Sequence, residues 1–240
     1  MIAEAIQKII ELAKPSIELV DGNLYSDKPM QYIATRKKCV REMAISGLPG
    51  LVQMVKSEAA LYATPEDPMF VEIVDPRNVR VFSSIDNDLD RSTWYHAEAD
   101  VPGFKSGYRS YEEFVIELRS RFVENEGSLY LLDLFSRMDI NERSVSEDNG
   151  ITQQVTVRQG ISLKDVETVR PIVELMPYRT FFEAEQPESE FLVRVDREGS
   201  IGLFEADGGM WKLMAKLYVA SWLEEQLAEL IDEGKVRVLR

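Results

Sequence analysis

The chain has 240 residues, of which 45% are hydrophobic, and a formal net charge of −14 at pH 7. That length suits one large domain or two small ones, and the apolar fraction is sufficient for a packed core. The single cysteine, Cys39, excludes an intramolecular disulfide, and with the single histidine, His96, it excludes the usual zinc ligand sets. The acidic balance makes duplex nucleic acid an improbable partner, because binding it requires Lys and Arg to displace counterions from phosphates.

No segment approaches the roughly 20 consecutive apolar residues of a membrane-spanning helix. The first residues carry Glu4 and Glu11, where a secretory signal would be basic and then apolar. We therefore expect a soluble, cytoplasmic protein with no membrane partner.

The first hundred residues predict alternating helices and strands. Apolar residues recur every three or four positions over 2–13, the spacing of one helical face, and Pro15 ends that helix. Asp21 and Gly22 supply a tight turn between two short strands. The expected elements are a helix over 2–13, two strands within 16–27, a strand within 31–45, a helix over 47–61, two strands within 67–84, a loop at 86–90 and a strand over 93–100.

The remaining residues predict further helices and strands. Phe114 and Leu118 belong to an amphipathic helical pattern, and Asp196 and Gly199 are typical of a type I turn between two strands. Asp207 is suited to cap the last helix. The expected elements are helices over 111–122 and 128–138, a strand within 144–160, strands over 169–182 and 191–205, and a long helix from 210 to 233.

Together these patterns predict an α+β protein with a mixed or antiparallel sheet, several amphipathic helices and a long C-terminal helix. We expect an N-terminal α+β part over 1–105 and a C-terminal α+β part over 106–240, or one continuous domain. Pro102 and Gly103 interrupt the pattern between the two parts.

The C-terminal helix carries more apolar side chains than one face can hold. Two adjoining stripes run along it at steps of three and four residues. Since large exposed apolar patches are uncommon on monomers, we expect this helix to mediate self-association. The residues expected at the interface are Leu213, Met214, Leu217, Tyr218 and Trp222.

A ligand site is expected where the last helix begins. Arg179 and Arg194 supply cations, Trp211 supplies an aromatic surface, and helix N-termini favour anions. The residues expected to line this pocket are Arg179, Arg194, Asp207, Gly208 and Trp211. In the alternative interpretation, Trp211 only packs against the sheet and Asp207 only caps the helix.

Carboxylates offer the best catalytic alternative in this sequence. If Glu183 and Glu185 lie on one strand, they share a sheet face and could bind a divalent metal or act as acid and base. Alternating Glu and Arg on a solvated sheet is equally typical of cross-strand charge pairing. The sequence has no Walker or dinucleotide glycine loop and no GxSxG motif, so we expect no cofactor and lean against an enzyme.

Two segments resemble hypothetical proteins from phages and prophages of Gram-positive bacteria, namely PYRTFFEAEQPESEFLVR at 177–194 and LFEADGGMWK at 203–212. Weaker matches are EDNGITQQVTVRQG at 147–160 and NLYSDK at 23–28. The order of elements is also similar to that of the YfdQ-like group of prophage proteins. The resemblance implies a phage origin and expression in the host cytoplasm, and it carries over no catalytic residue.

We therefore expect a phage accessory protein that acts as an oligomeric binding module for a host or phage partner or for a small anionic ligand. One alternative is a carboxylate-metal enzyme of phage DNA recombination or nucleic-acid metabolism. The other is an acidic DNA mimic that inhibits a host defence protein, which predicts salt-sensitive binding to a basic protein.

Overall fold

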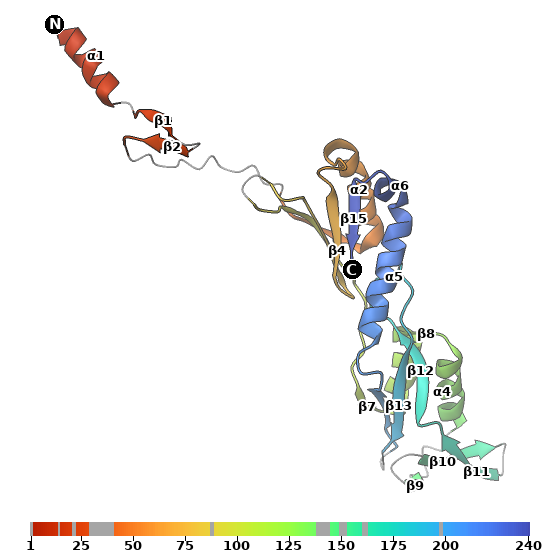
Figure 1. Cartoon of the computed structure of the whole chain (residues 1–240). Helices are drawn as coiled ribbons and strands as arrows, with labels where there is room; N and C mark the ends of the chain where they lie inside the picture. The colour runs from red at the N-terminus through yellow and green to blue at the C-terminus, as the bar shows by residue number, and fades with distance from the viewer. Residues whose placement is uncertain are drawn as a thin grey trace. The chain divides into compact units, whose positions relative to one another are not determined.

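The computed structural model describes residues 2–13, 15–20, 23–28, 41–86, 89–137, 145–148, 153–159, 163–196 and 199–240. The chain divides into two compact units, Met1–Cys39 and Val40–Arg240. Helices combine with antiparallel and mixed sheets, which confirms the predicted α+β class (Figure 1). The strand predicted within 31–45 lies outside the described residues up to position 40.

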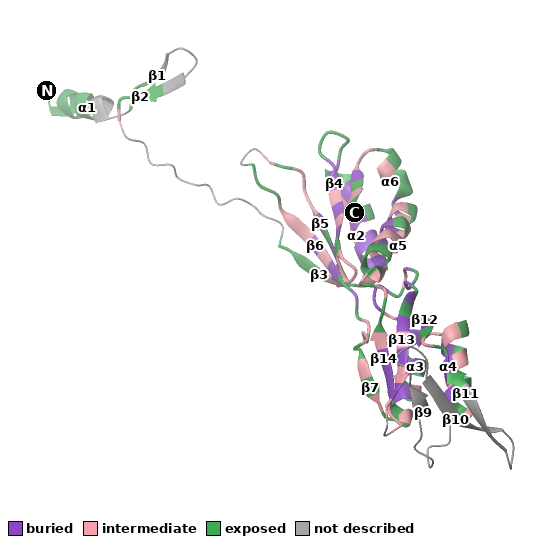
Figure 2. Ribbon diagram, turned by 60° about the horizontal axis from the view of Figure 1, so that its bottom comes forward, coloured by how far each residue is buried: buried purple, intermediate pink, exposed green. Residues whose placement is uncertain are grey.

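The N-terminal unit contains the predicted helix and hairpin. They are α1 (Ile2–Ala13) and the antiparallel pair β1 (Ile17–Val20) and β2 (Asn23–Ser26). None of the side chains described in this unit is buried, as the green colour of α1 in Figure 2 shows for the helix. Among the residues whose burial is described, the hydrophobic cores therefore consist of residues from the larger unit.

The first sheet of the larger unit has the strand order β15-β4-β5-β6-β3. The three central strands form an antiparallel meander, and the two edge strands join it in parallel. Its strands are β3 (Met43–Ser46), β4 (Met69–Asp75), β5 (Asn78–Phe82), β6 (Thr93–Glu98) and β15 (Val236–Leu239). The helices that contact it are α2 (Gly47–Tyr62), α5 (Trp211–Gln226) and α6 (Ala228–Asp232).

The second sheet of the larger unit has the order β7-β14-β13-β12-β8, with all neighbours antiparallel. Its strands are β7 (Gly107–Arg109), β8 (Phe122–Val123), β12 (Ile172–Pro177), β13 (Ser189–Val195) and β14 (Ile201–Glu205). Its helices are α3 (Tyr111–Arg121) and α4 (Glu126–Arg137). A separate sheet contains β9 (Val145–Asp148), β10 (Gln153–Gln159) and β11 (Leu163–Val169).

Two hydrophobic cores form, one against each five-stranded sheet. They do not follow the predicted boundary at residue 105, because α5 and β15 return from the C-terminus to the first sheet. Phe181 and Ala184 also belong to the first core, although the segments on both sides of them belong to the second sheet. The C-terminal helix is interrupted at Leu227, whose backbone leaves the helical region, and β15 follows.

The strand predicted over 169–182 is confirmed only over Ile172–Pro177. The chain forms the end of β11, then β12, and then an irregular segment over 178–188. The buried side chain of Gln186 explains the irregular segment. Its Oε1 accepts the backbone N–H groups of Arg179 and Thr180 at 2.9 and 3.2 Å, and its Nε2 donates to the Phe181 carbonyl at 2.9 Å. One side chain thus satisfies backbone groups that a strand would pair in a ladder.

Candidate functional site

The guanidinium of Arg179 is almost completely buried, with 2% of the residue exposed. Its Nη1 donates to the Ser189 hydroxyl and its Nη2 to Glu205 Oε1, both at 3.0 Å. The guanidinium carbon lies 4.5 Å from the centroid of the Trp211 ring and 5.2 Å from that of Phe191. Arg179 therefore links β13, β14 and the start of α5, and its charge is paired inside the protein.

Asp207 lies in the turn that leads into α5. Its carboxylate accepts the backbone N–H of Gly209 at 3.0 Å and that of Trp211 at 3.1 Å. Burial alone would raise the pKa of Asp207, but these two amides, the Ser189 hydroxyl and the charge of Arg179 together hold it below its usual value. The ionised carboxylate thus stabilises the fold at neutral pH, and this contribution is lost as the pH falls through the lowered pKa.

The structure brings together three of the five residues predicted for an anion pocket. Arg179, Asp207 and Trp211 form one cluster. Arg194 alternates with the buried residues of β13 and therefore lies on the sheet face opposite to Arg179. Gly208 is exposed in the turn with φ +64°. The cluster supports the interpretation that Asp207 caps and Trp211 packs, because the carboxylates already neutralise Arg179.

The segment over 178–188 also joins the two halves of the larger unit. The Arg179 carbonyl accepts a hydrogen bond from Arg77 Nε at 3.3 Å, and the Thr180 hydroxyl donates to the Pro76 carbonyl. Sequence patterns did not single out Thr180, Gln186 or Ser189, which are among the few buried polar residues described. The sequence does not mark them as buried, because a polar segment between two strands is usually exposed to solvent and the groups that these side chains contact are distant in the chain.

The predicted metal ligands Glu183 and Glu185 do not share a strand face, because both lie in the irregular segment. Glu185 is exposed, whereas Glu183 Oε1 lies 2.8 Å from the position that a Cβ at Gly47 would occupy. That places the Glu183 carboxylate at the N-terminus of α2, where a negative charge stabilises the helix. Within the described residues, no group of three or more His, Cys, Asp or Glu is arranged to hold a metal ion.

The predicted interface on α5 divides into exposed and half-buried residues. Leu213 and Met214 are 54% and 37% exposed, and Met210, just before the helix, is 60% exposed. The half-buried residues are Leu217, Tyr218 and Trp222, of which the two aromatics pack against the first core. Met210, Leu213, Met214 and Leu217 follow helical spacing, and we call them the α5 ridge.

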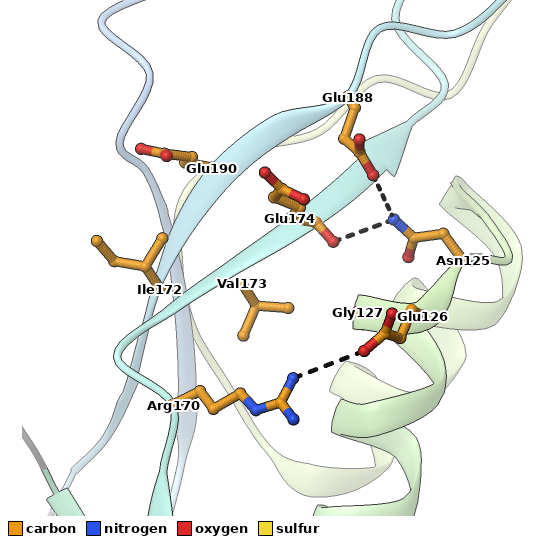
Figure 3. Close-up of a pocket in the computed structure, with 9 residues that line it drawn as sticks. All are labelled: Asn125, Glu126, Gly127, Arg170, Ile172, Val173, Glu174, Glu188 and Glu190. Carbon is orange, nitrogen blue, oxygen red and sulfur yellow. Dashed lines mark hydrogen bonds and ion pairs between the residues drawn. The ribbon is translucent and has the colours of Figure 1, made fainter.

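An open groove of about 370 Å³ lies where the start of α4 meets β12 and β13 (Figure 3). The Asn125 side-chain amide donates to the Glu174 carbonyl at 3.0 Å and to Glu188 Oε1 at 3.1 Å, while its oxygen accepts the Ser128 N–H. Asn125 thus caps α4 and holds Glu188 at the groove. The lining residues are Asn125, Glu126, Gly127, Arg170, Ile172, Val173, Glu174, Glu188 and Glu190.

Negative charge predominates in this groove. Among its described lining residues, four are glutamates and one, Arg170, is a cation. Arg170 lies 3.9 Å from the Glu126 carboxylate and stacks on the Tyr130 ring at 4.4 Å. Glu174 and Glu190, both exposed, are direct partners in the register of β12 and β13. Like charges directly opposite each other destabilise a sheet, so the groove contains repulsion that a bound cation would relieve.

The larger unit is thus a two-core α+β body with an internally paired arginine, an apolar ridge and an acidic groove. Comparison with family models, curated proteins and solved structures finds no match to this chain. Among the helices described, none combines the length and apolar character needed to cross a membrane.

Proposed function

We propose that the chain is a phage accessory protein that acts as a self-associating binding module rather than as an enzyme. Its acidic groove takes a segment of a host or phage protein that carries lysine or arginine. The observation that carries this proposal is the Glu174–Glu190 pair, since two exposed carboxylates in direct register cost stability unless a cation lies between them. The resemblance of 177–194 and 203–212 to prophage proteins supports the phage setting.

The structure gives less support to a small anionic ligand at Arg179. The charge of Arg179 is paired with Glu205, and its flat faces are occupied by Trp211 and Phe191. An anion would have to displace those partners from a buried site.

Removing the two opposed carboxylates of the groove is expected to weaken peptide binding while raising the stability of the protein. The double variant Glu174→Gln and Glu190→Gln should bind an oligolysine peptide at least about tenfold more weakly, because two carboxylate contacts become neutral. The same variant should gain up to about 1 kcal/mol of unfolding free energy as the repulsion disappears. Titration calorimetry and urea unfolding measure the two effects.

The matched control is Glu66→Gln with Glu185→Gln, which removes two exposed carboxylates outside the groove. A DNA mimic would spread its charge over the whole surface, so both double variants would then weaken peptide binding equally. Equal weakening, or no binding by the unaltered protein, would contradict the groove proposal.

Self-association is assigned to the α5 ridge in the same proposal. Leu213→Glu is expected to convert an oligomer into a monomer at micromolar concentration, because a charge would be buried against the apolar surface of a second copy. The unfolding free energy should change by no more than about 0.5 kcal/mol, since Leu213 is exposed within the single chain. Sedimentation velocity measures the mass, and the control is Lys212→Gln, which makes the same charge change at an exposed position on another face of α5. A monomeric unaltered protein rejects the assignment.

A further inference from the structure

The face of the first sheet that points away from α2 and α5 carries an aromatic pair. Along β4 and β5, alternate residues such as Val71 and Val81 are fully buried against the helices. Phe70 and Phe82 occupy the alternate positions, where they are half-buried. They are register partners, and their rings stack with centroids 5.4 Å apart and planes 14° apart. A pair of parallel, half-buried aromatic rings therefore lies on this side of the sheet.

Three arginines surround the pair. The Arg91 guanidinium lies 5.0 Å from the Phe70 ring and 5.3 Å from the Phe82 ring. Arg237 on β15 is the register partner of Phe70 and lies 6.0 Å from its ring. Arg80 lies 5.7 Å from the Phe82 ring. All three arginines are exposed, and the outermost two, Arg80 and Arg237, are 157 residues apart in the chain.

The charged groups that lie against the two rings are cationic, although the whole chain is acidic. Arg80 is paired with Glu72 on the neighbouring strand. No ion pair with a described carboxylate is formed by Arg91 or Arg237. Among the described residues, the guanidinium groups of Arg91 and Arg237 therefore have no carboxylate partner, and Arg91 donates to the Ser83 carbonyl at 3.1 Å. This surface is complementary to a ligand that combines negative charge with flat rings.

We propose that this face binds single-stranded nucleic acid. Bases stack on the aromatic pair, while arginines contact the phosphates, which is how sheets with exposed aromatics bind single strands. A guanidinium stacks on a base as well as on a phenyl ring, so a base that enters between Arg91 and the phenylalanines keeps both contacts. A duplex does not fit, because its base faces are covered by their neighbours. The site is separate from the acidic groove and goes beyond the proposed function.

The test is fluorescence anisotropy of a labelled oligothymidine of about 12 nucleotides with the full chain. Binding is expected at about 50 mM salt, with log K falling against log salt at a slope of about −1.4 for two phosphate contacts. Phe70→Leu with Phe82→Leu keeps apolar volume but removes stacking, and is expected to weaken binding about tenfold or more. The control Phe182→Leu alters a phenylalanine that is 59% exposed elsewhere, and binding should not change.

The arginines give an independent readout if the phenylalanine variants lose stability. Arg237→Gln should reduce the magnitude of the salt slope by about 0.7, whereas Arg119→Gln, the same charge change on α3, should leave it unaltered. Oligouridine in place of oligothymidine distinguishes RNA from DNA as the preferred strand. Absence of saturable binding, equal binding of a duplex, or unchanged affinity in the double leucine variant would overturn the proposal. Glu174→Gln with Glu190→Gln should not weaken oligonucleotide binding, so the acidic groove and the aromatic face are tested independently.

Discussion

Replacement of Arg179 by methionine is expected to lower the free energy of unfolding by about 3 kcal/mol. Methionine fills part of the volume, but it cannot donate to Ser189 or Glu205. The buried Ser189 hydroxyl would lose one of its two charged partners, and Asp207 would lose a nearby positive charge. Since Arg179 also stacks on Trp211, its removal would weaken the packing of the first turn of α5. Urea unfolding followed by tryptophan fluorescence measures the loss.

The control for Arg179 is Arg119→Met. Arg119 is paired with Glu124, and the two side chains are 58% and 62% exposed. Such surface pairs contribute at most about 1 kcal/mol, so the variant should remain close to the unaltered protein. Equal losses in the two variants would show that the buried cluster adds no stability beyond that of a surface pair.

Substitution of Gly127 by alanine is expected to cost about 2 kcal/mol. Gly127 is the second residue of α4, and a Cβ there would lie 2.0 Å from the Glu174 carbonyl oxygen and 2.7 Å from Val173 Cγ1. The backbone oxygen cannot rotate away, so α4 must shift from β12. Alanine in a helix otherwise gains about 1 kcal/mol over glycine, which makes a net loss diagnostic of close packing.

Thermal and urea unfolding of Gly127→Ala should be compared with Glu126→Ala. Glu126 precedes Gly127 in the same helical turn, and its side chain is 94% exposed, so its removal should be nearly neutral. Because α4 and β12 both line the acidic groove, Gly127→Ala should also weaken oligolysine binding. A variant more stable than the unaltered protein would contradict the observed approach of α4 to β12.

Several elements could be predicted because their causes lie within a few residues. The apolar spacing over 2–13 gives α1, and Asp21 with Gly22 lies between β1 and β2. The Asp196 carbonyl accepts the Gly199 N–H at 3.1 Å, as expected for the predicted type I turn. The strand predicted over 169–182 ends early, at Pro177, for the opposite reason, since buried Gln186 satisfies the following backbone groups from several residues away.

The candidate sites could be predicted only in part. Asp207 and Trp211 are near neighbours in the chain, so their association at the start of α5 was within reach of sequence reasoning. The sequence also predicts Arg194 as a cation of this pocket, but the alternation of β13 turns it to the other face. The pattern along the last helix correctly marked excess apolar surface, although Tyr218 and Trp222 pack partly against the first core.

The sequence by itself determined the net charge, the lack of disulfides and usual zinc sites, the α+β class and most helices and strands, because these follow from composition and short-range periodicity. Only the tertiary structure decided which distant residues meet. Arg237 reaches Phe70 because β15 joins β4 in parallel, and Glu174 faces Glu190 through the register of β12 with β13. Strand register depends on long-range packing, and a shift of one residue would turn each of these side chains to the opposite face.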